Sequence, residues 1–171
     1  GTQLTMRTFH TGGVATGSLI EKGISASTGS LIKTGTGTWT LSGQSSAAGT
    51  VGVLGGELVI DGATNGTLLS PVGISNGEAV FRGSSSSATS VSLPNLAMGV
   101  RSATANTLTL ASNGGAGVDL SVGSYSNATS TIFSNLIDLS SSPGNSVVIG
   151  SLGAGAFRPL SSGVLMSGAG S

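Results

Sequence analysis

The residues able to do acid–base or metal chemistry are few and scattered along this chain. His10 is the only histidine. The six acidic residues stand alone, at Glu21, Glu57, Asp61, Glu78, Asp119 and Asp138. One histidine cannot supply a histidine-based metal site within one chain. We therefore predict a solvent-facing or terminal position for His10, and no catalytic, cofactor-binding or metal-binding residues.

A serine motif is the first local pattern that could suggest an enzyme. Gly73-Ile-Ser-Asn-Gly77 matches the G-x-S-x-G pattern of hydrolase nucleophiles. That arrangement needs a strand, a sharp turn and a helix, together with a histidine later in the chain. No helical pattern follows here, and His10 precedes the serine. The match predicts a turn.

A glycine-rich stretch is the second such pattern. Gly114-Gly-Ala-Gly-Val-Asp-Leu-Ser-Val122 approaches the calcium-binding nonapeptide G-G-x-G-x-D-x-U-x, in which U is a large apolar residue. Here Ser121 holds that position, and a single copy cannot build the stacked turns that share each ion. We predict a glycine corner followed by a strand, and no calcium.

Composition points to a layered β-structure. The 171 residues include 30 glycines, only 7% are charged and 4% are aromatic, and the mean hydropathy is +0.36. This hydropathy opposes disorder. The formal charge is zero and no basic stripe is present, which excludes nucleic-acid binding by residues 18–171. Cysteine is absent, and no apolar run is long enough to span a membrane.

Short strand patterns recur between glycine, asparagine and serine residues, whereas helical periodicity is nearly absent. The expected strands lie at 37–41, 57–60, 78–81, 107–110, 118–122, 131–133, 146–149 and 163–166. Two of them repeat one pattern, in Gly56-Glu-Leu-Val-Ile-Asp-Gly62 and again in Gly77-Glu-Ala-Val-Phe-Arg-Gly83. The two segments begin at Gly56 and Gly77, a spacing close to the periods of about 20 residues that are typical of solenoids. This spacing predicts stacked coils, because one coil cannot bury its inward side chains alone.

The repeat predicts which side chains stack. Glu57 and Glu78 would occupy equivalent corners as like charges, while Asp61 and Arg82 would share another corner and could pair. Catalytic carboxylates of a sugar-cleaving solenoid would have to converge in one groove. We favour a solvated ladder over such a groove.

Residues 30–62 carry a recognisable pattern. Ser30-Leu-Ile-Lys-Thr-Gly-Thr-Gly-Thr-Trp-Thr-Leu-Ser-Gly43, followed by Gly55-Gly-Glu-Leu-Val-Ile-Asp-Gly62, resembles the autotransporter-associated β-strand repeat. The resemblance implies a parallel β-helix passenger that is exported and displayed or shed. Within it, Lys33 and Trp39 are expected to pack on a coil edge. The stretch from Gln44 to Thr50 departs from the family's usual loop.

The first segment resembles something else. Gly1-Thr-Gln-Leu-Thr-Met-Arg-Thr-Phe-His-Thr-Gly-Gly-Val-Ala15 is similar to the trigger loop of the bacterial RNA polymerase β′ subunit, whose nucleotide-contacting residues would fall on Met6, Arg7 and His10. Three accounts stay open: a fused piece, a coincidental solenoid strand at 4–9, or an insertion of residues 18–171 into a trigger loop. We predict that deleting residues 1–16 changes the melting temperature by only a few degrees.

Together these patterns predict an all-β chain: an N-terminal segment at 1–17, and at 18–171 a right-handed parallel β-solenoid with coils of roughly 20 residues. The predicted function is a structural or adhesive segment of a secreted or surface-displayed Gram-negative protein, without catalysis or cofactors. Its ligand, a surface glycan or a protein, stays open. The alternatives are a polymerase trigger-loop piece and a carbohydrate-active solenoid. Gly1 is not a natural start, so we expect a fragment or a processed product.

The expected solenoid also predicts self-association. A solenoid end exposes an unpaired strand edge unless a polar cap covers it. No charged residue follows Arg158, and the net charge of the chain is near zero. We therefore predict end-to-end association through the last coil, into dimers or short filaments.

Overall fold

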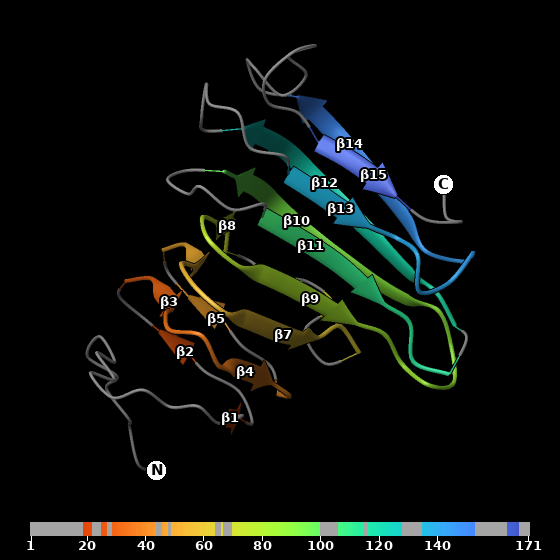
Figure 1. Ribbon diagram of the computed structural model, residues 1–171. Coiled ribbons are helices and arrows are strands. Elements are labelled where there is room, and N and C mark those ends of the chain that lie inside the picture. Colours follow the sequence, from red (N-terminus) through yellow and green to blue (C-terminus); the bar gives the residue numbers. More distant parts are fainter. Residues whose placement is uncertain are drawn as a thin grey trace.

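The protein is built from strands alone over the residues that the structure, a computed structural model, describes. These residues are 19–21, 25–26, 29–43, 46–47, 49–63, 66, 70–99, 106–114, 116–127, 135–152 and 164–167. They contain no helix and form two large parallel sheets and one small one (Figure 1). The all-β prediction is confirmed for this part of the chain.

The larger sheet has seven strands in the order β1-β4-β7-β9-β11-β13-β15, and every neighbouring pair is parallel. Its strands are β1 (Leu19–Glu21), β4 (Thr38–Leu41), β7 (Glu57–Asp61), β9 (Glu78–Arg82), β11 (Asn106–Ala111), β13 (Asn135–Asp138) and β15 (Val164–Ser167).

The second sheet has six parallel strands in the order β14-β12-β10-β8-β6-β3. Its strands are β3 (Leu31–Lys33), β6 (Val51–Val53), β8 (Val72–Ile74), β10 (Thr89–Met98), β12 (Val118–Asn127) and β14 (Ser146–Leu152). A two-stranded sheet pairs β2 (Ser25–Ala26) with β5 (Ser46–Ala47).

The chain alternates between the two large sheets. Each strand of the six-stranded sheet is followed in the chain by a strand of the seven-stranded sheet. When the chain returns to a sheet, its new strand lies beside the previous strand of that sheet, and only the short β2 and β5 belong to neither large sheet. We call one such pair of strands a round. Figure 1 shows the rounds following one another from the red to the blue end of the molecule.

The length of a round changes part-way along the molecule. Thr38 pairs with Glu57, which lies 19 residues later, and Glu57 in turn pairs with Glu78. From β9 onward the rounds are longer, since Asn106 pairs with Asn135, which lies 29 residues later. The predicted spacing of roughly 20 residues, typical of short solenoid coils, therefore holds up to Arg82 and is wrong beyond it.

The core lies between the two large sheets. Alternate side chains of the seven-stranded sheet point inward, and one inward row runs Leu41, Ile60, Phe81 and Leu110. In the six-stranded sheet an inward row runs Leu31, Val51, Val72, Leu96 and Tyr125. The core thus consists mostly of aliphatic side chains, as the low aromatic content predicts.

The two longest strands bend in the middle. In β10 the buried positions are Val91 and Leu93, then Leu96 and Met98, so the alternation shifts by one residue at Pro94. Strand β12 shifts at the same register, because Val122 and Tyr125 are both buried. One long strand therefore serves two faces of the molecule.

Most expected strands are present, with changed limits. The expected strands at 118–122 and 146–149 extend to Asn127 and Leu152. The expected strand at 131–133 lies outside the described residues. Sequence patterns missed β1, β2, β3, β5, β6, β8, β10 and β13 as separate strands.

Candidate functional site

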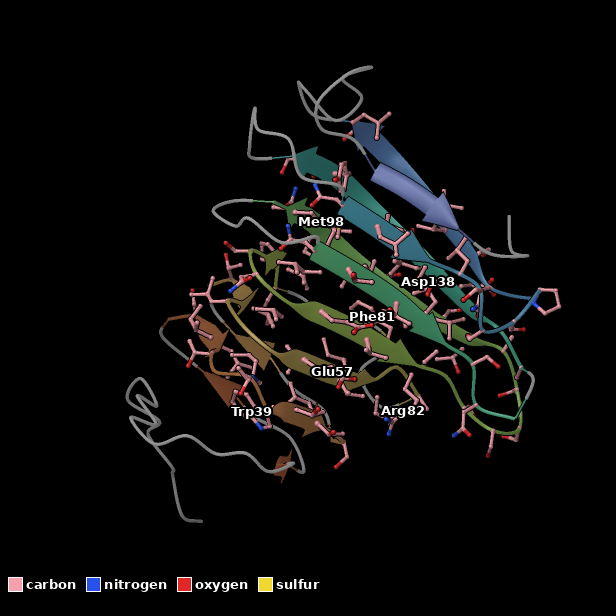
Figure 2. The ribbon with its side chains drawn as sticks, in the orientation of Figure 1. Trp39, Glu57, Phe81, Arg82, Met98 and Asp138 are labelled. Carbon is pink, nitrogen blue, oxygen red and sulfur yellow. The ribbon has the colours of Figure 1, made fainter. Side chains whose placement is uncertain are left out.

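The outer face of the seven-stranded sheet carries the acidic residues that the repeat places in register. Glu57 pairs with Glu78, and the same row begins at Thr38 and continues to Thr107. The predicted stacking of the two glutamates is thus present. Figure 2 shows Glu57 at the start of β7 and Arg82 at the far end of β9.

Each glutamate of this row is held by a threonine from a neighbouring strand. The Thr38 hydroxyl donates a hydrogen bond of 2.8 Å to Glu57 Oε2. The Thr109 hydroxyl donates one of 2.5 Å to Glu78 Oε1. The two donors come from opposite sides of the pair, β4 and β11, so the carboxylates are engaged away from each other. This arrangement reduces the repulsion expected of like charges on adjacent strands.

Asp61 and Arg82 occupy the other end of the same two strands. They are register partners, as the repeat predicts. Arg82 is exposed, and Asp61 Oδ1 accepts a hydrogen bond of 3.0 Å from the backbone N–H of Ala63. Opposite charges at such an exposed position contribute little to stability, about 0–1 kcal/mol.

Each of the two sequence motifs spans a turn and the end of a strand. Ser75–Gly77 connects β8 to β9, and the Ser75 N–H donates to Val53 O at 2.9 Å. Gly114 adopts φ +76° in a turn that precedes β12, and Asp119 in that strand accepts a hydrogen bond from the Ser146 hydroxyl at 2.6 Å. Within the described ranges no three His, Asp or Glu side chains lie close enough to hold a metal ion.

The lysine of the repeat makes three hydrogen bonds with backbone carbonyls. Lys33 is only 6% exposed, and its Nζ donates to the carbonyls of Thr34 (2.9 Å), Gly35 (2.9 Å) and Gly55 (3.0 Å). Gly55 belongs to the next round, so this ammonium group joins two rounds. Burial lowers the pKa of Lys33 from its ordinary value, while the Glu57 carboxylate acts in the opposite direction.

Gly56 makes room for this ammonium group. Its φ of +64° lies in the left-handed region, where a Cβ is unfavourable. A Cβ there would also collide with Gly35 O, and it would lie 2.8 Å from Lys33 Nζ. The lysine and the glycine of the repeat therefore form one structural unit.

Trp39 does not lie on an edge, contrary to the sequence-based expectation. It is 9% exposed and belongs to the core cluster, in register with Leu58. The reason is alternation, since Trp39 and Leu41 share the inward face of β4. Its indole N–H has no hydrogen-bond partner in the part of the chain that the structure describes.

A buried polar cluster lies inside the longer rounds. Asn106 Nδ2 donates to Asn135 Oδ1 at 3.0 Å, and Asn135 Nδ2 lies 3.5 Å from the Tyr125 hydroxyl. All three side chains are at most 1% exposed. Burial raises the pKa of Tyr125 to about 12, because it disfavours the phenolate, while the hydrogen bond with Asn135 acts weakly the other way.

Asn145 fastens the corner between β13 and β14. Its Nδ2 donates to Leu110 O at 2.9 Å and to Leu139 O at 3.2 Å, and its Oδ1 accepts from Val118 N–H at 2.9 Å. Leu110 lies in β11 and Val118 in β12, which belong to two successive rounds. One side chain thus satisfies backbone groups of two rounds.

Sequence reasoning missed these buried amides. The available signal was a second period, because Asn106 and Asn135 lie 29 residues apart. That period becomes visible only when the chain beyond residue 84 is compared with itself at a spacing longer than that of the first repeat.

Met6, Arg7 and His10 lie outside the described residues. No helix long and apolar enough to cross a bilayer occurs among the residues that are described. Comparison of the chain with protein-family models, curated proteins and solved structures found no match. Among the polar side chains described, Lys33, Asn145 and the Asn106–Asn135 pair bond to groups of an adjacent round.

Proposed function

We propose that residues 18–171 form a right-handed parallel β-solenoid that serves as a structural or adhesive segment of a secreted or surface-displayed protein of the autotransporter type, without catalysis. The observation that carries the proposal is the Lys33–Gly56 unit. Lys33, one of the residues that resemble the repeat, joins one round to the next, and Gly56, another, leaves the space that its ammonium group needs.

The order of the strands supports the solenoid. A chain that alternates between two parallel sheets and returns each time beside its previous strand winds in one direction. Parallel strands joined by such crossovers are right-handed in about 98% of cases. Each round buries the inward side chains of its neighbours, which is the way a solenoid forms its core.

The use of the polar residues supports a structural role. Lys33, Asn145 and the Asn106–Asn135 pair bind backbone or amide groups of adjacent rounds. Glu57 and Glu78 accept threonine hydroxyls on a continuous sheet face. Such groups stiffen a rod that holds a binding region away from a surface.

The location is tested with antibodies against residues 84–88, which lie in the connection before β10 and are mostly exposed. We expect the antibody to label intact cells of the source organism or its culture medium. An antibody against a cytoplasmic protein, which should label only lysed cells, is the control. Labelling restricted to lysed cells would contradict surface display.

A separate assay addresses catalysis. The purified chain is incubated with a panel of plant and bacterial polysaccharides, and reducing ends are measured. We expect no release above a heat-denatured control. Release that is lost in a Glu57→Gln or Glu78→Gln variant would instead favour the carbohydrate-active alternative.

A further inference from the structure

The two ends of the six-stranded sheet differ in how well they are covered. At the β3 end, Leu31 is 8% exposed and Lys33 is 6% exposed. At the β14 end, Leu152 is 51% exposed, and Val148, which lies beside the exposed Ser121 on the outer face, is 64% exposed. Leu152 is in register with the buried Tyr125, so it is the last member of an inward row. No described residue covers it on the far side.

The open end is apolar and uncharged. Strand β14 reads Ser-Val-Val-Ile-Gly-Ser-Leu, and strand β15, at the end of the other large sheet, reads Val-Leu-Met-Ser. Val147 and Ile149 are only partly buried and pack against the core. Edge strands of soluble proteins are normally protected by charge, proline or a covering segment. Ser146–Leu152 carries neither charge nor proline, and its outer edge pairs with no described strand.

We propose that this end is an interface for a second copy of the chain, joined tail to tail about a two-fold axis through Val148. The inference does not depend on the proposed function. When β14 pairs antiparallel with β14 of the second copy, centred on Val148, the Val147 of each copy lies opposite the Ile149 of the other. The two Val148 side chains then lie opposite each other. Ser146 then lies opposite Gly150, where the strand begins to bend. The apolar residues therefore match one another.

A head-to-tail stack fits the molecule less well. Strand β3 is short and its inward side chains are already covered, whereas β14 is more than twice as long. The rounds at the two ends also differ in length, since the 19 residues between Thr38 and Glu57 give way to 27 residues between Asp119 and Ser146. Of the large apolar side chains described, only Leu54, Val148 and Leu152 are exposed. The best apolar complement for this end is another copy of the same end.

The contact is small. A stable dimer commonly buries about 800 Å² on each partner, and the paired part of one edge strand with the adjoining apolar end buries less than that. We therefore expect a reversible dimer that forms at micromolar or higher concentration. Its closed two-fold symmetry stops growth at two chains.

Sedimentation velocity over a hundred-fold range of concentration tests the proposal. We expect the mass of the full chain to rise from one chain toward two. In Val148→Lys/Leu152→Lys the mass should stay at one chain, because the two lysines at position 148 would lie opposite each other as like charges and the lysine at 152 would bring a charge to the apolar end. The matched control is Ser86→Lys/Ser87→Lys, which adds the same charge on an exposed connection and should dimerise like the parent. Circular dichroism confirms that each variant is folded.

A single cysteine determines the geometry, since the chain has none of its own. Oxidised Val148→Cys should give mostly disulfide-linked dimer, because residues opposite each other on antiparallel strands lie at a disulfide-compatible distance. Ser87→Cys should not. A monomer at every concentration, growth beyond two chains, equal effects of both lysine pairs, or no Val148→Cys crosslink would each overturn the proposal.

Discussion

The narrow region (residues 29–82) and the wide region (residues 83–152 with 164–167) form continuous sheets but fasten their rounds differently. In the narrow region the connection from β3 to β4 is the short Thr34–Gly37, and it is held by backbone carbonyls around Lys33. In the wide region the corner before β14 relies on the side-chain amide of Asn145, and the amide pair Asn106–Asn135 joins β11 to β13. In both regions a side chain pairs with backbone groups at a corner: the ammonium group of Lys33 in the narrow region and the amide of Asn145 in the wide one.

A row of unusual residues marks the change from short separate strands to one bent strand. Pro94 lies within β10, a central strand of its sheet, where a proline is rare because it cannot donate to a neighbour. Gly123 stands beside it in β12, and a Cβ there would lie 2.7 Å from Pro94 O. Gly150 continues the row, with its Cβ position 2.9 Å from Gly123 O. The bend thus needs small residues in each following round.

The largest expected effect is a loss of stability caused by Gly56→Ala in the narrow region. Gly56→Ala places a Cβ at φ +64° against Gly35 O and beside Lys33 Nζ. We expect a loss of about 3–5 kcal/mol in the free energy of unfolding, measured by urea denaturation. Gly35→Ala is the control: its φ is +79° but nothing lies near its Cβ, so about 1 kcal/mol should be lost. Equal losses would show that backbone strain alone matters and that the lysine unit does not.

The next effect concerns the wide region. Asn145→Ala leaves the buried N–H of Val118 without its partner and removes the tie to Leu139 O. We expect a loss of about 2–3 kcal/mol, and faster hydrogen exchange at Val118. Asn95→Ala, whose amide binds only Ser124 of the next strand, is the control and should cost about 1 kcal/mol. A smaller loss for Asn145→Ala than for the control would refute the corner role.

Raising the pH should change the free energy of unfolding in opposite directions through Tyr125 in the wide region and Lys33 in the narrow region. Burial raises the pKa of Tyr125 to about 12, so its contribution is present below pH 10 and is lost as the pH rises from 10 to about 12. We expect unfolding to become easier by about 2 kcal/mol over this window, with the slope absent in Tyr125→Phe. Lys33 has a lowered pKa, so it acts oppositely, adding stability as the pH rises toward 10.5. A slope that survives in Tyr125→Phe would assign it to another group.

The smallest expected effect is on the outer surface of the seven-stranded sheet, where the two regions meet. Arg82→Gln removes the charge beside Asp61 at an exposed position. We expect the free energy of unfolding to change by less than about 0.5 kcal/mol, and the difference to vanish at high salt. Thermal unfolding at low and high ionic strength measures it. A loss comparable to that of Asn145→Ala would mean that this pair, rather than the amides, joins the rounds.

Much of the narrow region could be predicted from the sequence because its repeat is local and nearly regular. The strands at Glu57 and Glu78 and their register follow from the two similar segments. The short strands β6 and β8 were missed because Val51-Gly-Val53 and Val72-Gly-Ile74 are too brief to show alternation. Strand β10 was missed although it alternates over Thr89–Leu93, because Pro94 normally argues against a central strand.

By itself, the sequence determined that the chain forms strands and that Glu57 stacks on Glu78 and Asp61 on Arg82. These features depend on alternation and on a short, regular repeat, which are properties of neighbouring residues. Only the tertiary structure decided the longer rounds of the wide region, the buried places of Trp39 and Lys33, and the amides that close the corners. Those depend on backbone groups left unpaired by another round, and a residue's own neighbours in sequence do not reveal which groups these are.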